Sequence, residues 1–319
     1  MLSRPGSAAA LTDFIGHTPL LPIGGLEGVS VEVAVFGKAE WFNPGGSVKD
    51  RAAWGMVQAA EASGALVPGR MILDATSGNT GIALAWIGAA RGYRVTLCLP
   101  ANAGAGRRRL LAALGAELVL TDAMAGTDGA IEVARRMAAE DPARIWYADQ
   151  YSNAANWRAH YHGTAEEIWE QSGGRITHLV AGIGTSGTLV GAGRRLRELD
   201  PAIEVVAVQP DSPYHALEGL KHLPSARVPA IYDPAVHQRT LEVASEDAIE
   251  MAKRQARRGL PIGGSAGAAL VAAERLARGL VRGVIVAVLP DSAERYLDGP
   301  LWEPEPGPGA RHGGAEPRP

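Results

Sequence analysis

The chain has 319 residues, of which 46% are hydrophobic and 20% are charged, as in soluble globular proteins. Its formal net charge of −3 excludes the strongly basic surface of a nucleic-acid-binding protein and the acidic bias of a disordered chain. No apolar run approaches the roughly 18 residues of a membrane span, so we expect a cytoplasmic protein. The single cysteine, Cys98, is expected to be a buried hydrophobic residue.

Apolar runs typical of strands alternate along the chain with segments typical of helices. The expected strands cover residues 31–36, 71–75, 94–100, 117–121, 176–183, 203–208 and 284–290. The expected helices cover residues 49–63, 79–91, 105–114, 128–140, 154–172, 187–199, 245–258 and 266–278. This alternation predicts an α/β fold of two doubly wound lobes with mostly parallel sheets. Ligands of such sheets bind where strands end and helices begin, and four of these junctions are rich in Gly, Ser, Thr and Asn.

The first junction is "NPGGSVKDR", residues 43–51. Ser47 is expected to cap a helix, which places Lys49 in its first turn, where a cation costs about 0.3–1 kcal/mol against the helix dipole. A locally unfavourable choice of residue indicates function. The same field lowers the pKa of the ammonium group, as a lysine nucleophile requires. The alternative is a solvated Lys-Asp-Arg trio at the start of a helix.

The second junction is "DATSGNTGIALAW", residues 74–86. Thr76, Ser77, Asn79 and Thr80 bring hydroxyls, an amide and free backbone N–H groups to a helix N-terminus, which suits a carboxylate or a phosphate. Ordinary capping by Ser77 or Asn79 is the alternative.

The third junction, "GIGTSGTLVGAG", matches the GxGxxG dinucleotide pattern at Gly182, Gly184 and Gly187. A nicotinamide-dependent oxidoreductase would use this loop, with Asp211 near the expected place of a ribose-binding acid. That hypothesis leaves the first two junctions without a role. The fourth junction, "PIGGSAGAALVAA", places Ser265 after two glycines and by itself predicts a tight turn with a cap.

Together these stretches resemble the cysteine synthase and cystathionine β-synthase family of pyridoxal phosphate enzymes, which have fold type II (tryptophan synthase β-like). The matching stretches, in the order of the family, are "GHTPL" (16–20), "NPGGSVKDR" (43–51), "TSGNTGIALA" (76–85), "GIGTSGTLVGAGR" (182–194), "GGSAGAA" (263–269) and "LPDSAERYL" (289–297). The stretch "NPGGSVKDR" looks closest to that of B-type cysteine synthases.

The resemblance implies that pyridoxal 5'-phosphate is the cofactor and that Lys49 forms the internal aldimine with it. Asn79 would bond the ring oxygen, and Ser265 would face the pyridine nitrogen. A hydroxyl there does not keep the nitrogen protonated, which favours prompt β-elimination over a long-lived carbanion. The cofactor phosphate would be bound by Gly184, Thr185, Ser186, Gly187 and Thr188.

The resemblance also implies the substrate contacts. Thr76, Ser77 and Thr80 would close on the substrate carboxylate, and Gln150 would complete this clamp. Gln150 ends a strand-like run and offers two N–H donors, and without the resemblance a surface amide is the favoured alternative. Gly219 matches a family turn beside the site. Lys221, His222 and Arg227 would either meet a phosphate leaving group or be solvated loop charges.

The implied reaction is β-replacement on O-acetylserine or O-phosphoserine with sulfide to give L-cysteine, through the Lys49 aldimine and an α-aminoacrylate. Lys49 would remove the Cα proton as general base. The alternatives are cystathionine β-synthase, which uses serine and homocysteine, and the oxidoreductase. The missing haem segment and regulatory domain of longer cystathionine β-synthases favour cysteine synthase.

The expected organisation follows the family. Residues 1–44 would pack on the larger lobe, 45–150 would form a smaller mobile lobe, 151–302 the larger cofactor-binding lobe, and 303–319 a disordered Pro/Gly-rich tail. The expected partners are the amino acid, the sulfur nucleophile and a second copy in a homodimer, with no nucleic acid and no membrane. The histidines lack metal-ligand spacing, so no metal site is expected, and Arg107–Arg109 is expected to be a solvated helix face.

Overall fold

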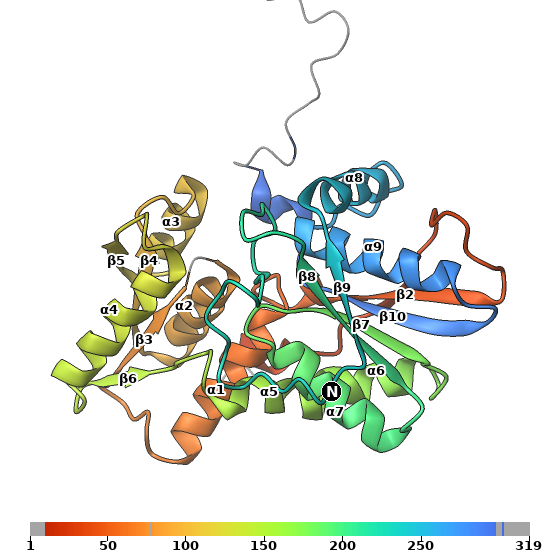
Figure 1. Cartoon of the computed structure of the whole chain (residues 1–319). Coiled ribbons are helices and arrows are strands. Elements are labelled where there is room, and N and C mark those ends of the chain that lie inside the picture. Colours follow the sequence, from red (N-terminus) through yellow and green to blue (C-terminus); the bar gives the residue numbers. More distant parts are fainter. Residues whose placement is uncertain (1–9, 77, 298–301, 303–319) are drawn as a thin grey trace, which may run out of the picture.

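Two β-sheets, each covered by helices on both faces, make up the molecule (Figure 1). This computed structural model describes residues 10–76, 78–297 and 302. The larger sheet has the strand order β1-β2-β10-β7-β8-β9, and the smaller has the order β5-β4-β3-β6. Every pair is parallel except the antiparallel pair β1–β2. The predicted α/β class with mostly parallel sheets is confirmed.

The strands are β1 (Leu20–Pro22), β2 (Val33–Ala39), β3 (Met71–Ala75), β4 (Arg94–Pro100), β5 (Glu117–Thr121), β6 (Ile145–Tyr147), β7 (His178–Gly182), β8 (Glu204–Pro210), β9 (Arg239–Val243) and β10 (Gly283–Leu289). The α-helices are α1 (Lys49–Ala62), α2 (Asn79–Arg91), α3 (Ala105–Ala113), α4 (Gly126–Glu140), α5 (Ala154–Ala159), α6 (Ala165–Gln171), α7 (Gly187–Leu199), α8 (Ser245–Ala256) and α9 (Gly264–Arg278). Short helical turns are η1 (Leu11–Phe14), η2 (Glu40–Phe42), η3 (His160–Thr164) and η4 (Ala293–Tyr296).

All strands predicted from apolar runs are present, with ends shifted by up to three residues. The strands β1, β6 and β9 were not predicted; they are short strands at the edges of the two sheets. Edge strands face solvent on one side and need no continuous apolar run, so they leave a weak pattern. The helix predicted over 154–172 is interrupted by η3, a π-helical turn between α5 and α6.

The smaller sheet packs between α2 on one face and α4 on the other. Glycines bring α2 close to the sheet, because a Cβ on Gly88 would lie 2.3 Å from Val95 Cγ2. On the opposite face, Ala130 and Ile131 of α4 cover Cys98. Cys98 has no exposed surface, which confirms that it is a buried hydrophobic residue.

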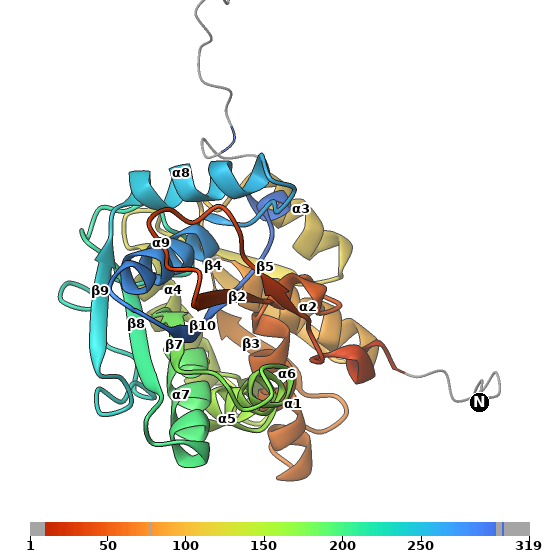
Figure 2. The ribbon, with the colours of Figure 1, turned by 90° about the vertical axis from the view of Figure 1, so that its right-hand side faces the viewer.

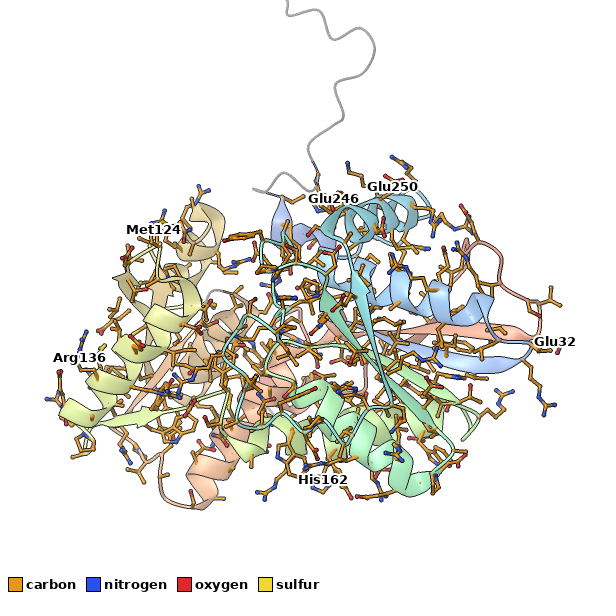
Figure 3. All side chains as sticks on the ribbon, in the orientation of Figure 1. Glu32, Met124, Arg136, His162, Glu246 and Glu250 are labelled. Carbon is orange, nitrogen blue, oxygen red and sulfur yellow. The ribbon has the colours of Figure 1, made fainter. Side chains whose placement is uncertain are left out.

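The larger sheet lies between α8 and α9 on one face and α6 and α7 on the other (Figure 2). Small residues let α8 and α9 approach closely, since a Cβ on Gly267 would lie 2.1 Å from the carbonyl oxygen of Ala248. Charged side chains such as Arg136 on α4 and Glu246 and Glu250 on α8 lie on the outer helix faces (Figure 3). Among the described residues, no helix has the length and apolarity needed to cross a membrane.

The first strands of the chain, β1 and β2, pair within the larger sheet, and β3 to β6 form the smaller one. Helix α1 packs on α2 of the smaller body and on α5. The lobe boundaries at residues 45 and 151 and the mobility of the smaller lobe stay predictions. The tail 303–319, expected to be disordered, lies outside the described residues.

Candidate active site

A cavity of about 820 Å³ lies where strands of both sheets end. Its walls include residues that lie within three positions after the ends of β3, β6, β7, β8 and β10. This edge is where open parallel sheets bind ligands. The cavity brings together these residues singled out from the sequence: Lys49, Thr76, Asn79, Thr80, Gln150, Gly184, Thr185, Ser186, Gly187, Thr188, Gly219 and Ser265. Ser77 lies outside the described residues.

Lys49 is the first residue of α1, and its position is fixed by the end of β10. The backbone N–H of Val48 donates to Pro290 O (2.9 Å), and Ser47 forms an isolated β-bridge with Asp291. Val48, directly before α1, has helical dihedral angles and makes no side-chain cap bond. Ser47 Oγ accepts from the backbone N–H of Lys49 (3.3 Å), so Ser47 caps the first turn as predicted.

The surroundings of Lys49 favour a neutral amine. Burial lowers the pKa of Lys49, and the carboxylates of Asp291 and Glu40 oppose this only in part. Its two neighbours are also buried, since Asp50 is 0% exposed and Arg51 is 5% exposed. The alternative of a solvated Lys-Asp-Arg trio is therefore wrong. An amine with a lowered pKa is the form that attacks an aldehyde or accepts a proton.

The glycine-rich loop between β7 and α7 forms a cradle of N–H and hydroxyl groups. Ser186 has a positive φ of 69°, and its buried Oγ has no hydrogen-bond partner within the described part of the chain. Thr185 Oγ1 accepts from the backbone N–H of Gly187 (3.3 Å) and from Asn156 Nδ2 (3.1 Å). Because α7 begins at this loop, its free N–H groups and the helix dipole suit a phosphate dianion.

The glycines of this loop are required by contacts within the protein. A Cβ on Gly184 would lie 2.2 Å from the carbonyl oxygen of Gly219. A Cβ on Gly187 would lie 2.0 Å from Asn156 Oδ1. The GxGxxG spacing is thus explained by packing at the cavity wall, and it does not by itself indicate a dinucleotide.

A histidine that the sequence analysis left without a role supports the cradle. His160 is 1% exposed, and its Nε2 lies 3.3 Å from Thr188 Oγ1 while its Nδ1 lies 2.9 Å from Thr164 Oγ1. Burial, together with the charge of Arg51, lowers the pKa of His160 to about 3. The imidazole is therefore neutral, and it orients the hydroxyl of Thr188 without adding a positive charge.

The loop after β3 caps α2 through an unexpected residue. Thr76 Oγ1 accepts from the backbone N–H groups of Gly78 and Gly81, both at 3.2 Å. Asn79 does not cap the helix; its Nδ2 donates to Asp291 Oδ2 (2.6 Å). The buried Oδ1 of Asn79 has no partner in the described residues, so this amide still has an acceptor to offer to the cavity.

Gln150 is 3% exposed, so the alternative of a surface amide is wrong. Its Oε1 accepts from Thr80 Oγ1 (2.8 Å). Its Nε2 donates to Asp74 Oδ2 (3.1 Å) and to the carbonyl oxygen of Ala75 (2.8 Å). The side chain lies at the cavity, as the sequence predicts, but both of its N–H groups are engaged within the protein.

Several cavity residues were missed from the sequence. Asp291 is 1% exposed and accepts from both Asn79 and the hydroxyl of Tyr296 (2.6 Å), and burial raises its pKa. Arg107 lines the cavity and pairs with Glu218 (2.8 Å), so the expected solvated helix face is wrong for Arg107. Its partner is 111 residues away in the chain, and no local pattern signals such a contact.

The remaining basic residues divide between two cavities. Lys221 and His222 line the large cavity, and Lys221 also lines an adjoining cavity of about 110 Å³ with Arg227. The side chain of Lys221 is 14% exposed, with its Nζ 3.9 Å from Asp128 and 5.0 Å from the ring centroid of Tyr151. Lys221 is therefore not a solvated loop charge.

Comparison with known proteins gives consistent matches over most of the chain. Residues 11–291 match the family described as pyridoxal-phosphate dependent enzyme. A cysteine synthase of Aquifex aeolicus is 48% identical over 295 residues, which cover 90% of each chain. A cysteine synthase B of Escherichia coli is 39% identical over 290 residues, or 91% of this chain and 94% of the relative. The crystal structure of a cysteine synthase (OASS) from Entamoeba histolytica superposes with a TM-score of 0.89 at 33% identity, over 96% of this chain and 94% of that one.

Proposed function

This chain belongs to the pyridoxal-phosphate dependent enzymes, within their cysteine synthase branch, and we propose that the cavity between its two sheets is the catalytic site. The enzyme forms L-cysteine from an activated serine, with pyridoxal phosphate as cofactor. The observation that supports the site best is that one cavity joins Lys49, an amine with a lowered pKa, to the cradle at 184–188. Pyridoxal phosphate carries a phosphate, which matches the cradle, and an aldehyde carbon, which matches the amine of Lys49.

The residues present fit the cofactor. Ser186 Oγ and Asn79 Oδ1 are buried without partners among the described residues, and the cradle stands at the start of α7. The loop 184–188 would bind the phosphate, Asn79 the ring oxygen, and Ser265, which is 4% exposed, would face the ring nitrogen. When bound, the cofactor supplies an electron sink that lets a leaving group depart from the substrate Cβ and a nucleophile add there.

Lys49 would hold the cofactor through its amine. Once the amino group of the substrate has replaced it, Lys49 Nζ is the base that would take the proton from the substrate Cα. Asp291, which acts electrostatically on Lys49, faces the same cavity. The lowered pKa of Lys49 raises the fraction of neutral amine that is ready for both tasks.

The substrate would be held at the smaller sheet. Thr76, Thr80 and Gln150 line the cavity and would bind the α-carboxylate. Lys221 and His222 lie at the same cavity and would face the leaving group on Cβ. This arrangement suits an O-acetyl or an O-phosphoryl ester of serine, with sulfide as the sulfur nucleophile.

The experiment adds O-acetylserine, O-phosphoserine and serine separately to the holoenzyme and records its visible absorption spectrum, then measures cysteine after sulfide is added. We expect one of the two esters to change the cofactor band and to yield cysteine. Serine with homocysteine serves as the control for cystathionine formation. A spectrum that none of the amino acids changes would contradict the proposed function.

We also propose that the enzyme is a homodimer. The exposed side chains of Leu11, Phe14 and Phe42 support this, because they project from two neighbouring turns, η1 and η2, joined by a bond from the backbone N–H of Gly16 to Asn43 Oδ1 (2.8 Å). Analytical ultracentrifugation should give twice the 33.3 kDa mass of the chain, and a single-chain mass would contradict this. A cytoplasmic location, expected from the sequence, stays a proposal.

A further inference from the structure

A buried carboxyl group lies directly beneath the substrate-binding wall, and none of the roles described above uses it. Asp74, near the end of β3, is 0% exposed and contacts Gln150. We propose that Asp74 is a positioning residue that decides whether the Gln150 amide stays turned inward or turns towards the carboxylate of the amino-acid substrate. This inference rests on the proposed function, since it assumes that the amino acid binds at this wall.

The geometry shows why Gln150 needs to be released. Its two N–H groups donate to Asp74 Oδ2 and to Ala75 O, and the hydroxyl proton of Thr80 is given to Gln150 Oε1. In this arrangement neither the side-chain amide of Gln150 nor the hydroxyl of Thr80 has a proton left for a substrate carboxylate. A bond from Gln150 to the substrate therefore requires that one of its inward bonds be exchanged.

The bond to Asp74 is the one that can vary. The bond to Ala75 O is shorter (2.8 Å against 3.1 Å) and its acceptor cannot change charge. An ionised Asp74 would hold the amide by a charge-assisted bond, about twice as strong as a neutral one. It would also repel the negative charge of the incoming carboxylate. A protonated Asp74 holds the amide weakly and carries no charge.

The environment of Asp74 keeps it protonated at neutral pH. Burial, with a further contribution from Asp149, raises the pKa of Asp74 to about 8. The other titratable groups that face it are Cys98 from β4, Tyr147 from β6 and Tyr151 after β6, each of which has a raised pKa and stays neutral. Two cations lie nearby, and neither pairs with Asp74: Arg135 of α4 approaches Asp149 at 4.0 Å, and Lys221 Nζ lies 5.0 Å from the ring centroid of Tyr151. Gln150 is thus free to turn at neutral pH and is held inward above pH 8.

The experiment measures binding of L-alanine, which has no leaving group on Cβ, to the holoenzyme from the change in its visible spectrum between pH 6 and 9.5. Asp74→Asn supplies a neutral group of the same shape. The dissociation constant of the unmodified enzyme, divided by that of the variant, should rise about tenfold from pH 7 to 9, as the competent fraction falls. Taking this ratio cancels the titration of the amino group of L-alanine. A ratio that stays constant over this range would overturn the proposal.

Two further variants sharpen the result. Asp149→Asn should keep the rise but move its midpoint to lower pH, because Asp149 contributes to the raised pKa of Asp74. Asp74→Ser, a second neutral substitution, should flatten the profile as Asp74→Asn does. With O-acetylserine or O-phosphoserine as substrate, Asp74→Asn should lower KM at pH 9 and leave kcat within about twofold. The reason is that the fraction of enzyme competent to bind changes the apparent affinity for the substrate. If L-alanine and every candidate substrate leave the spectrum unchanged, the proposed function itself fails, and the role of Asp74 fails with it.

Discussion

Two clusters of buried charge in this protein differ in how their carboxylates are paired. Behind α1, Arg51 binds Glu40 (2.7 Å) and Glu167 (2.6 Å), and Lys38 also donates to Glu167 (2.6 Å). Under the substrate wall, Asp74 has no cationic partner among the described residues, and the charge that acts on it is that of Asp149. Both clusters are buried, so the difference lies in the pairing.

The pKa values follow the pairing. Burial alone would raise the pKa of Glu167, but Arg51 and Lys38 outweigh it and hold the pKa at about 2. Glu40 behaves in the same way, and Arg51 lowers its pKa. Burial of Asp74 is opposed only by hydrogen bonds from Ala75 and Gln150, without a cation, and raises its pKa to about 8. A paired buried charge is fixed in one state, whereas an unpaired acid can change state near neutral pH.

The paired cluster positions Lys49 from a distance. Arg51 lies two residues after Lys49 on α1, and its partners lie on η2 and α6. Its Nη2 also donates to Thr18 Oγ1 (3.0 Å), in the segment "GHTPL". The paired cluster therefore joins the N-terminal segment to α1, which carries Lys49, and to α6 on the larger sheet. Asp74, by contrast, lies on the side where the substrate would bind.

The largest expected effect comes from breaking the paired cluster. Arg51→Met leaves Glu40 buried without its main cation, which should lower the free energy of unfolding by about 3–5 kcal/mol. Urea unfolding of the holoenzyme at pH 7 measures it. Arg91→Met, which breaks a more exposed pair with Glu61, is the control and should cost under about 1 kcal/mol. Equal losses in the two variants would remove the distinction between buried and solvent-screened ion pairs.

The second effect is a pH dependence of opposite sign in the two clusters. The pKa of Glu167 is lowered from 4.5 to about 2, so its stabilisation is present above pH 4.5 and is lost as pH falls towards 2. The pKa of Asp74 is raised from 3.8 to about 8. Between these pH values Asp74 is protonated in the folded protein and ionised in the unfolded chain. Its contribution to stability therefore falls as pH rises, by up to about 1.4 kcal/mol per pH unit.

This dependence is checked by urea unfolding of the holoenzyme and of Asp74→Asn at several values from pH 5 to 8. The free energy of unfolding of the variant, minus that of the unmodified enzyme, should rise with pH, because groups common to both cancel. A difference that stays flat across this range would mean that Asp74 is ionised in the folded protein.

The sequence predicted those features that depend on local pattern. The strand and helix alternation and the loops at 76–80 and 184–188 are visible as runs of residue types, and the structure brings the described ones to one cavity. The sequence did not predict that the amide of Gln150 is buried and engaged, or that Asp74 has no cationic partner among the described residues. Both depend on contacts between residues far apart in the chain, such as the bond from Gln150 to Asp74, which are 76 residues apart. Edge strands such as β9 were missed because they need no apolar run.

The most direct test identifies the lysine that holds the cofactor. The chain has four lysines, Lys38, Lys49, Lys221 and Lys253, of which Lys49 and Lys221 line the cavity. Borohydride reduction of the holoenzyme makes the bond between cofactor and lysine permanent, and peptide mass spectrometry then locates it. We expect the pyridoxyl mass on the peptide that contains Lys49. A label on Lys221, or on any lysine other than Lys49, would contradict the site described here.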